Sequence, residues 1–162
     1  MKTLDDILLL GDPRLYEVCA PVTREELPEL MPVVEDLAGL VLQFRAKYGA
    51  GRAIAAPQIG VMKRLVVMNV GQPKAFFNPV LFDCSEEMME LWDDCMSFPN
   101  LLVRLQRHRY CKMRFFNASW EEEVWELSDD LSELMQHEID HLDGVLATSR
   151  ALDDQSLKLQ LR

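Results

Sequence analysis

Residues 128–142, "SDDLSELMQHEIDHL", combine two periodic patterns in one short stretch. An α-helix advances about 100° per residue, which gathers one set of apolar side chains into a narrow arc. That set is Leu131, Met135, Ile139 and Leu142. His137 and His141 lie four residues apart on a different arc, so they are neighbours on the helix surface. We therefore predict a helix that begins after Ser128 as its N-cap, with one face toward the core and the histidines on another.

Glu138, directly after the first histidine, indicates that His137 and His141 could belong to a catalytic metal site. Two histidines at this spacing can bind one metal ion, and the glutamate between them can take a proton from water on that ion. A solvated acidic helix that merely carries two imidazoles is the alternative. A catalytic metal site needs a third protein ligand, and no histidine or cysteine follows His141. Cys95, in "DDCMSFPN" (93–100), is the upstream candidate, which would give one thiolate, two imidazoles and an open position.

The remaining pattern predicts an α+β fold in which antiparallel strands pack around this helix and a second, earlier helix. Apolar residues at helical spacing place the earlier helix at 28–47, and residues 48–60 are too rich in Gly, Ala and Pro for a regular element until their end. Strands are expected at 64–70, 75–82, 109–116 and 122–127. A "GQPK" turn (71–74) joins the first two strands, and the last two form a hairpin. We expect a single domain over 1–162.

Composition narrows the functional classes. The net charge of −10 disfavours a phosphate backbone, so we expect no direct nucleic-acid binding, and the basic residues of 103–114 form a local patch at most. No apolar run approaches the roughly 20 residues of a membrane span, and no export signal is visible. We expect a cytoplasmic protein without membrane contact. Cys19, Cys84 and Cys111 are expected to be reduced, buried small residues.

Three ordered motifs resemble those of the peptide deformylase family. "HEIDH" (137–141) is similar to its HExDH motif, and "DDCMSFP" (93–99) is similar to its EGCLS segment. "GRAIAAPQIG" (51–60) is similar to its GxGxAAxQ segment. The likeness extends over roughly residues 5–150 and implies the peptide deformylase fold.

The resemblance also implies roles for individual residues. Cys95, His137 and His141 would hold one divalent metal ion, Fe²⁺ in cells, with Zn²⁺ or Ni²⁺ as other occupants. Glu138 would be the general base toward a metal-bound water. Gln58 and the backbone N–H of Met96 would donate to the oxyanion. The implied reaction is hydrolysis of the N-formyl group of N-formylmethionyl peptides, so the partner would be a formylated peptide or the N-terminus of a nascent chain.

The segments that would contact substrate depart from the family pattern. The resemblance places Gly51, Arg52, Ile54 and Glu133 there, but Arg52 and Glu133 stand where the family has apolar residues. Ala53 replaces the second glycine, and Asp94 replaces the glycine before the cysteine. Our hypothesis is that Arg52 and Glu133 form an ion pair that reshapes the pocket; the alternative is that both point to solvent. The same departures leave open a non-catalytic or altered-specificity relative that binds peptide or another N-acyl substrate.

Overall fold

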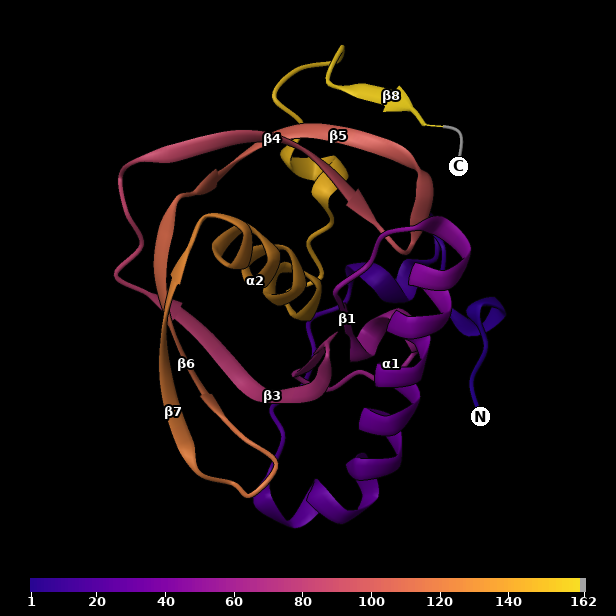
Figure 1. The fold of residues 1–162 in the computed structure, drawn as a ribbon, viewed down its shortest axis with the longest axis vertical. Helices are drawn as coiled ribbons and strands as arrows, with labels where there is room; N and C mark the ends of the chain where they lie inside the picture. The colour runs from indigo at the N-terminus through magenta and orange to yellow at the C-terminus, as the bar shows by residue number, and fades with distance from the viewer. Residues whose placement is uncertain (161–162) are drawn as a thin grey trace.

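The computed structural model describes residues 1–160, and its centre is a single buried helix. That helix, α2 (Asp129–Leu142), lies between two antiparallel sheets, and the longer α1 (Leu27–Tyr48) runs along the far side of β1 (Figure 1). Within residues 1–160, no helix is both long and apolar enough to cross a membrane.

The larger sheet has five strands in the order β1-β2-β3-β6-β7, and every neighbouring pair is antiparallel. Its strands are β1 (Ala53–Ala55), β2 (Leu65–Val70), β3 (Gln72–Phe82), β6 (Tyr110–Phe116) and β7 (Glu122–Ser128). The smaller sheet has the order β4-β5-β8, with β4 (Met88–Cys95), β5 (Phe98–His108) and β8 (Leu157–Leu159). The fold is α+β, as the sequence predicts.

Helix α1 forms because its apolar residues recur at helical spacing. Its buried side chains are Leu30, Val34, Leu37, Ala38, Leu40, Val41 and Phe44. Pro28 stands in the first turn, where no intrahelical N–H is needed. Gly49 ends the helix with φ of 75°, a left-handed conformation that glycine adopts without steric cost.

Several local predictions are corrected by the structure. Residues 48–60 contain strand β1, because pairing with β2 overrides their small-residue composition. The four-residue turn shrinks to Gly71 (φ 94°), since Val70 already pairs with Gln72. Ser128 is the N-cap residue of α2, as predicted, but its side chain makes no capping hydrogen bond. Strands β4, β5 and β8 were not predicted from the sequence. Cys19 and Cys111 are buried as expected, whereas Cys84 is only half-buried.

Helix α2 is buried on nearly every side, which rejects the solvated-helix alternative. Met135, Ile139 and Leu142 pack into the core as expected, whereas Leu131 is only partly buried. The opposite face is also enclosed, because His137, Glu138 and His141 are each at most 5% exposed. Strands of both sheets contact the helix, so its polar face lies inside the molecule rather than in water.

Candidate metal centre and active site

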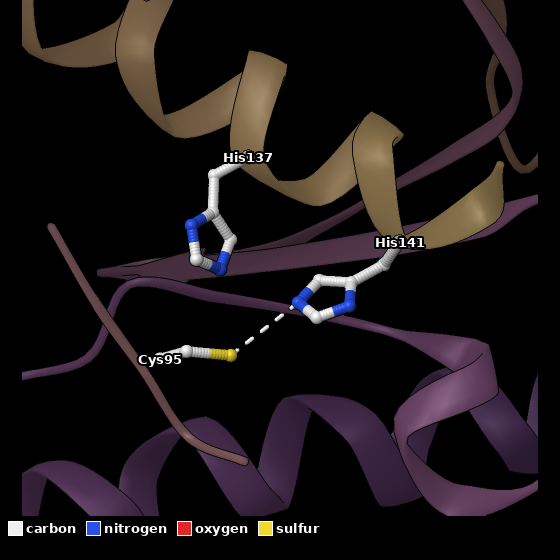
Figure 2. A group of neighbouring side chains, drawn as sticks. All are labelled: Cys95, His137 and His141. Carbon is white, nitrogen blue, oxygen red and sulfur yellow. Dashed lines mark hydrogen bonds between the residues drawn. The ribbon is translucent and has the colours of Figure 1, made fainter. Parts of the chain in front are cut away.

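Three side chains from two elements converge on one point beneath α2. The ligand atoms of Cys95, His137 and His141 all lie within 4.8 Å of one another, and all three residues are buried. Figure 2 shows both imidazoles directed toward the cysteine, whose Sγ lies 3.4 Å from His141 Nε2. A sulfur and a nitrogen ligand of a tetrahedral zinc ion stand about 3.6 Å apart, given the usual bond lengths. The donor set therefore fits a divalent transition metal.

The local backbone explains why the three donors meet. His137 and His141 occupy successive turns of α2, and their ring centroids are 5.0 Å apart. Asp93 and Cys95 are two residues apart on β4, so both face the helix, as alternate residues of a strand do. The β4–β5 register shifts between these two residues. Such irregularities commonly redirect side chains at strand ends beside active sites.

A chain of buried charges orients the first histidine. His137 Nδ1 lies 2.8 Å from Asp93 Oδ2, which leaves Nε2 for a metal. Arg107, 2% exposed, donates to the same Asp93 oxygen at 3.1 Å and to Asp140 at 2.7 Å. Arg150 in turn donates to both oxygens of Asp140. This network therefore fixes the orientation of the His137 imidazole.

The same network sets the ionisation of its members. Burial alone would raise the pKa of the Asp93 carboxyl, but His137 and Arg107 outweigh burial and lower it to about 2. Burial alone would lower the pKa of His137, but the neighbouring Asp93 carboxylate and the contact with Cys95 hold it well above its usual value. For His141, burial and the neighbouring His137 both lower the pKa. Asp93 is therefore a fixed anion beside the donor set.

Gln58 is held with its amide directed at the cysteine. It lies in the 3₁₀ turn Ala56–Ile59, and its Oε1 accepts a hydrogen bond from the Ala55 backbone N–H at 2.9 Å. This bond leaves the NH₂ group to donate to Ser97 Oγ at 3.1 Å and toward Cys95 Sγ at 3.5 Å. Gln58 is thus a rigid donor beside the metal ligands.

Glu138 is the most exceptional group of the site. Within residues 1–160, its Oε1 is a buried side-chain oxygen without a hydrogen-bond partner, and His141 Nδ1 is likewise unpartnered. Burial raises the pKa of Glu138 to about 7, while the nearby His137 acts in the opposite direction. An orphaned carboxylate oxygen beside a metal-type donor set is suited to hold water, and a pKa near neutrality suits proton transfer in both directions.

One cavity of about 220 Å³ opens onto this centre. Its wall combines the metal-site residues with the predicted substrate segments: Phe44, Ala50, Gly51, Arg52, Ala53, Gln58, Asp93, Asp94, Cys95, Met96, Glu133, Leu134, His137 and Glu138. Ile54 instead lies fully buried in the core behind the wall, so its assigned contact with substrate stays a prediction.

Two of the cavity residues form the ion pair that the sequence suggested. Arg52 Nη2 lies 2.5 Å from Glu133 Oε1, so the hypothesis of a pair is confirmed over that of two solvent-directed side chains. Gly51 has φ of 127°, and a Cβ there would lie 3.0 Å from Met96 Cε, which explains the glycine. Ala53 sits in regular β1 and is not among the described residues of positive φ, so its replacement of glycine strains no backbone.

Sequence reasoning missed the residues behind the metal ligands. Arg107 is one of the basic residues of 103–114, for which the sequence predicts a local patch at most, but it is buried between Asp93 and Asp140. Ser97, the partner of Gln58, was not singled out either. The sequence around Arg107 gives no signal of its burial, because the two acids that pair with it are distant in sequence.

Comparisons with known proteins place this geometry in a family. A family model described as polypeptide deformylase matches residues 4–156. The peptide deformylase of Acidothermus cellulolyticus is 39% identical over 157 residues, covering 96% of this chain and 83% of that protein. That of Thermotoga neapolitana is 32% identical over 157 residues, covering 96% of this chain and 92% of that protein.

Solved structures agree with the sequence relatives. The crystal structure of peptide deformylase from Thermotoga maritima matches with a TM-score of 0.83 and 32% identity, over 91% of this chain and 97% of that one. A Legionella pneumophila peptide deformylase matches with a TM-score of 0.82 and 26% identity, over 93% and 86%. Fold, motifs and near-complete coverage lead to one conclusion: the chain belongs to the polypeptide deformylase family.

Proposed function

We propose that this chain hydrolyses the N-formyl group of formylated peptides, with Glu138 as the general base. Membership of the family makes the chain a hydrolase, and the family removes N-formyl groups from nascent peptides. The observation that carries the assignment to Glu138 is its unpartnered, buried Oε1 on the wall of the cavity, beside the donors Cys95 and His137.

Each residue has a defined task in this proposal. Cys95, His137 and His141 hold a divalent cation, for which we propose Fe²⁺ in cells, with Zn²⁺ or Ni²⁺ as substitutes. When bound, the cation supplies a Lewis acid that makes water available as a nucleophile at neutral pH. Asp93 fixes the orientation of His137 through the 2.8 Å contact to Nδ1.

The chain's own groups then handle the proton and the charge. Glu138 accepts the proton of the attacking water and returns it to the nitrogen of the leaving peptide amine. The Gln58 amide donates to the oxygen that becomes negative, and the backbone N–H of Met96, next to Cys95, is the second proposed donor. One such donor contributes roughly 3 kcal/mol to transition-state stabilisation.

A single assay tests the proposal. The protein, loaded anaerobically with Fe²⁺ or Ni²⁺, is mixed with formyl-Met-Ala-Ser, and formate release is measured. Glu138→Gln should lower kcat by at least about a hundredfold while metal content is unchanged, since general-base catalysis contributes about 10²–10⁴. Glu35→Gln, on the exposed face of α1, is the matched control and should have wild-type activity.

The alternative is a relative that binds peptide without hydrolysing it. Absence of formate from several peptides with fully metallated protein would support that alternative and refute the proposed hydrolysis. Activity that survives Glu138→Gln would instead refute the assigned base. For the protein in its cell we propose a cytoplasmic location and, as partner, a formylated peptide or the N-terminus of a nascent chain, without direct contact to nucleic acid or membrane.

A further inference from the structure

An ion pair forms part of the wall of the reaction cavity. Arg52, just before β1, and Glu133, on α2, line the same cavity as Cys95 and Glu138. The Arg52 guanidinium lies 2.5 Å from the Glu133 carboxylate and also donates to the Asp130 carbonyl at 3.4 Å. A substrate bound at the metal site therefore has the Arg52–Glu133 ion pair beside it.

The distance along α2 matches the reach of a substrate side chain. Glu133 precedes His137 by one turn, about 6 Å of helix rise. In an N-formyl amino acid the formyl carbon and Cα share one nitrogen, so they stand about 2.4 Å apart. A side chain of four or five atoms spans the remaining distance. The first side chain of a bound formyl peptide can therefore reach the ion pair.

Arg52 and Glu133 differ in how easily each side chain can move out of the ion pair into water. The Arg52 side chain is 41% exposed, whereas that of Glu133 is only 13% exposed. Arg52 can move into water at little cost, because half-exposed ion pairs contribute little to stability. Glu133 stays in place, and a buried carboxylate without a hydrogen-bond donor is costly. A substrate that displaces Arg52 must therefore supply a donor itself.

The charge of the cavity favours the same kind of substrate. Four acidic residues line the cavity: Asp93, Asp94, Glu133 and Glu138. Among the described residues 1–160, Arg52 is the only arginine or lysine that lines it. Arg107 and His137 offset the charge of Asp93. Beside the ion pair, the carboxylate left when Arg52 moves away is that of Glu133, which attracts a positive or donor group and repels an acidic side chain.

We propose that Arg52 and Glu133 form a subsite that selects a hydrogen-bond-donating first side chain, an amide or an ammonium, which displaces Arg52 and donates to Glu133. This inference rests on the proposed function, because it names the class of formyl peptide that the chain hydrolyses best. Methionine enters the same subsite but leaves the Glu133 carboxylate without a new partner, so it is accepted less efficiently.

Four peptides of the form formyl-Xaa-Ala-Ser test the proposal with the Ni²⁺-loaded protein. Xaa is Met, Gln, Glu or Lys, of which the first three are matched in length. We expect kcat/KM for Gln and Lys to exceed that for Met by about tenfold, since a site built to hydrogen-bond rejects an analogue without the donor. The Glu peptide should be the poorest. A highest kcat/KM for Met would overturn the proposal.

Two variants separate the roles of the pair. Glu133→Gln keeps the shape but removes the charge, so the Lys advantage over Met should disappear. Arg52→Ala removes the competing cation, so kcat/KM for the Lys peptide should rise at least threefold relative to kcat/KM for the Met peptide. Thermal unfolding and metal content establish that each variant is folded and loaded, and Glu35→Gln serves as the control. An unchanged peptide ranking in Glu133→Gln would refute the subsite.

A binding measurement distinguishes failure of the subsite from failure of the proposed function. Titration calorimetry with unformylated Lys-Ala-Ser and Met-Ala-Ser requires no turnover. If no peptide releases formate but Lys-Ala-Ser binds more tightly than Met-Ala-Ser, and Glu133→Gln abolishes that difference, the subsite stands and the hydrolysis is refuted. Equal binding of both tripeptides to the wild type, together with equal kcat/KM, would refute the subsite and leave hydrolysis intact.

Discussion

Replacing Arg107 by methionine removes a buried charge behind the metal ligands and keeps most of the side-chain volume. Arg107 is 2% exposed and donates to Asp93 at 3.1 Å and to Asp140 at 2.7 Å. Removing one partner of a buried ion pair costs about 3–5 kcal/mol, because the other charge stays buried without compensation. Here Asp93 retains His137 and Asp140 retains Arg150, so we expect the lower end of that range, about 3 kcal/mol.

The same substitution should weaken metal binding. Asp93 orients His137, and loss of a group that orients a metal ligand typically costs 10–100-fold in affinity. Urea unfolding of the metal-free protein measures the stability change, and competition with a chelator measures the affinity for Zn²⁺. Arg104→Met is the matched control on the same strand: its side chain is 34% exposed and pairs with Asp153 at 3.3 Å, so the cost should be about 1 kcal/mol or less.

The result that would refute this reasoning is equally specific. If Arg107→Met unfolds within about 1 kcal/mol of the Arg104→Met control and binds Zn²⁺ with wild-type affinity, then the buried network neither stabilises the fold nor positions the histidine. A loss of stability without a loss of affinity would restrict Arg107 to a structural role.

Three further outcomes can be checked on the same protein. Gly144→Ala should destabilise by at least about 2 kcal/mol in urea, because φ is 71° and the new Cβ would lie 2.5 Å from the Tyr16 carbonyl oxygen; Gly39→Ala, in open space on α1, should stabilise slightly. Burial raises the pKa of Cys19 to about 11, and burial and then the neighbouring Cys84 thiol raise that of Cys111 to about 12. Both thiols are therefore protonated at pH 8, and iodoacetamide should label neither until the protein unfolds; labelling of the native protein would contradict this. Removal of bound Zn²⁺ by a chelator should lower Tm, and an unchanged Tm would argue against a metal bound to the folded state.

Much of the site could be predicted from the sequence because its signals are local. The spacing of His137 and His141 on a helix is a property of 3.6-residue periodicity alone, and Glu138 follows from the same stretch. The α1 helix and the β6–β7 hairpin were also predictable, since their apolar patterns repeat with the period of the element. The proximity of Arg52 to Glu133 was inferred from their motif positions, although 81 residues separate them.

Other features depend on contacts that no local pattern encodes. Strand β1 is a strand because it pairs with β2, and its own composition argues against one. From the sequence alone, Arg107 is expected at the surface; only the fold brings Asp93 and Asp140 to either side of it. Local periodicity thus determined the helices and the metal-binding motif, whereas burial and pairing across the sheets decided which charges enter the core, because the energy of a charge depends on neighbours that are distant in sequence.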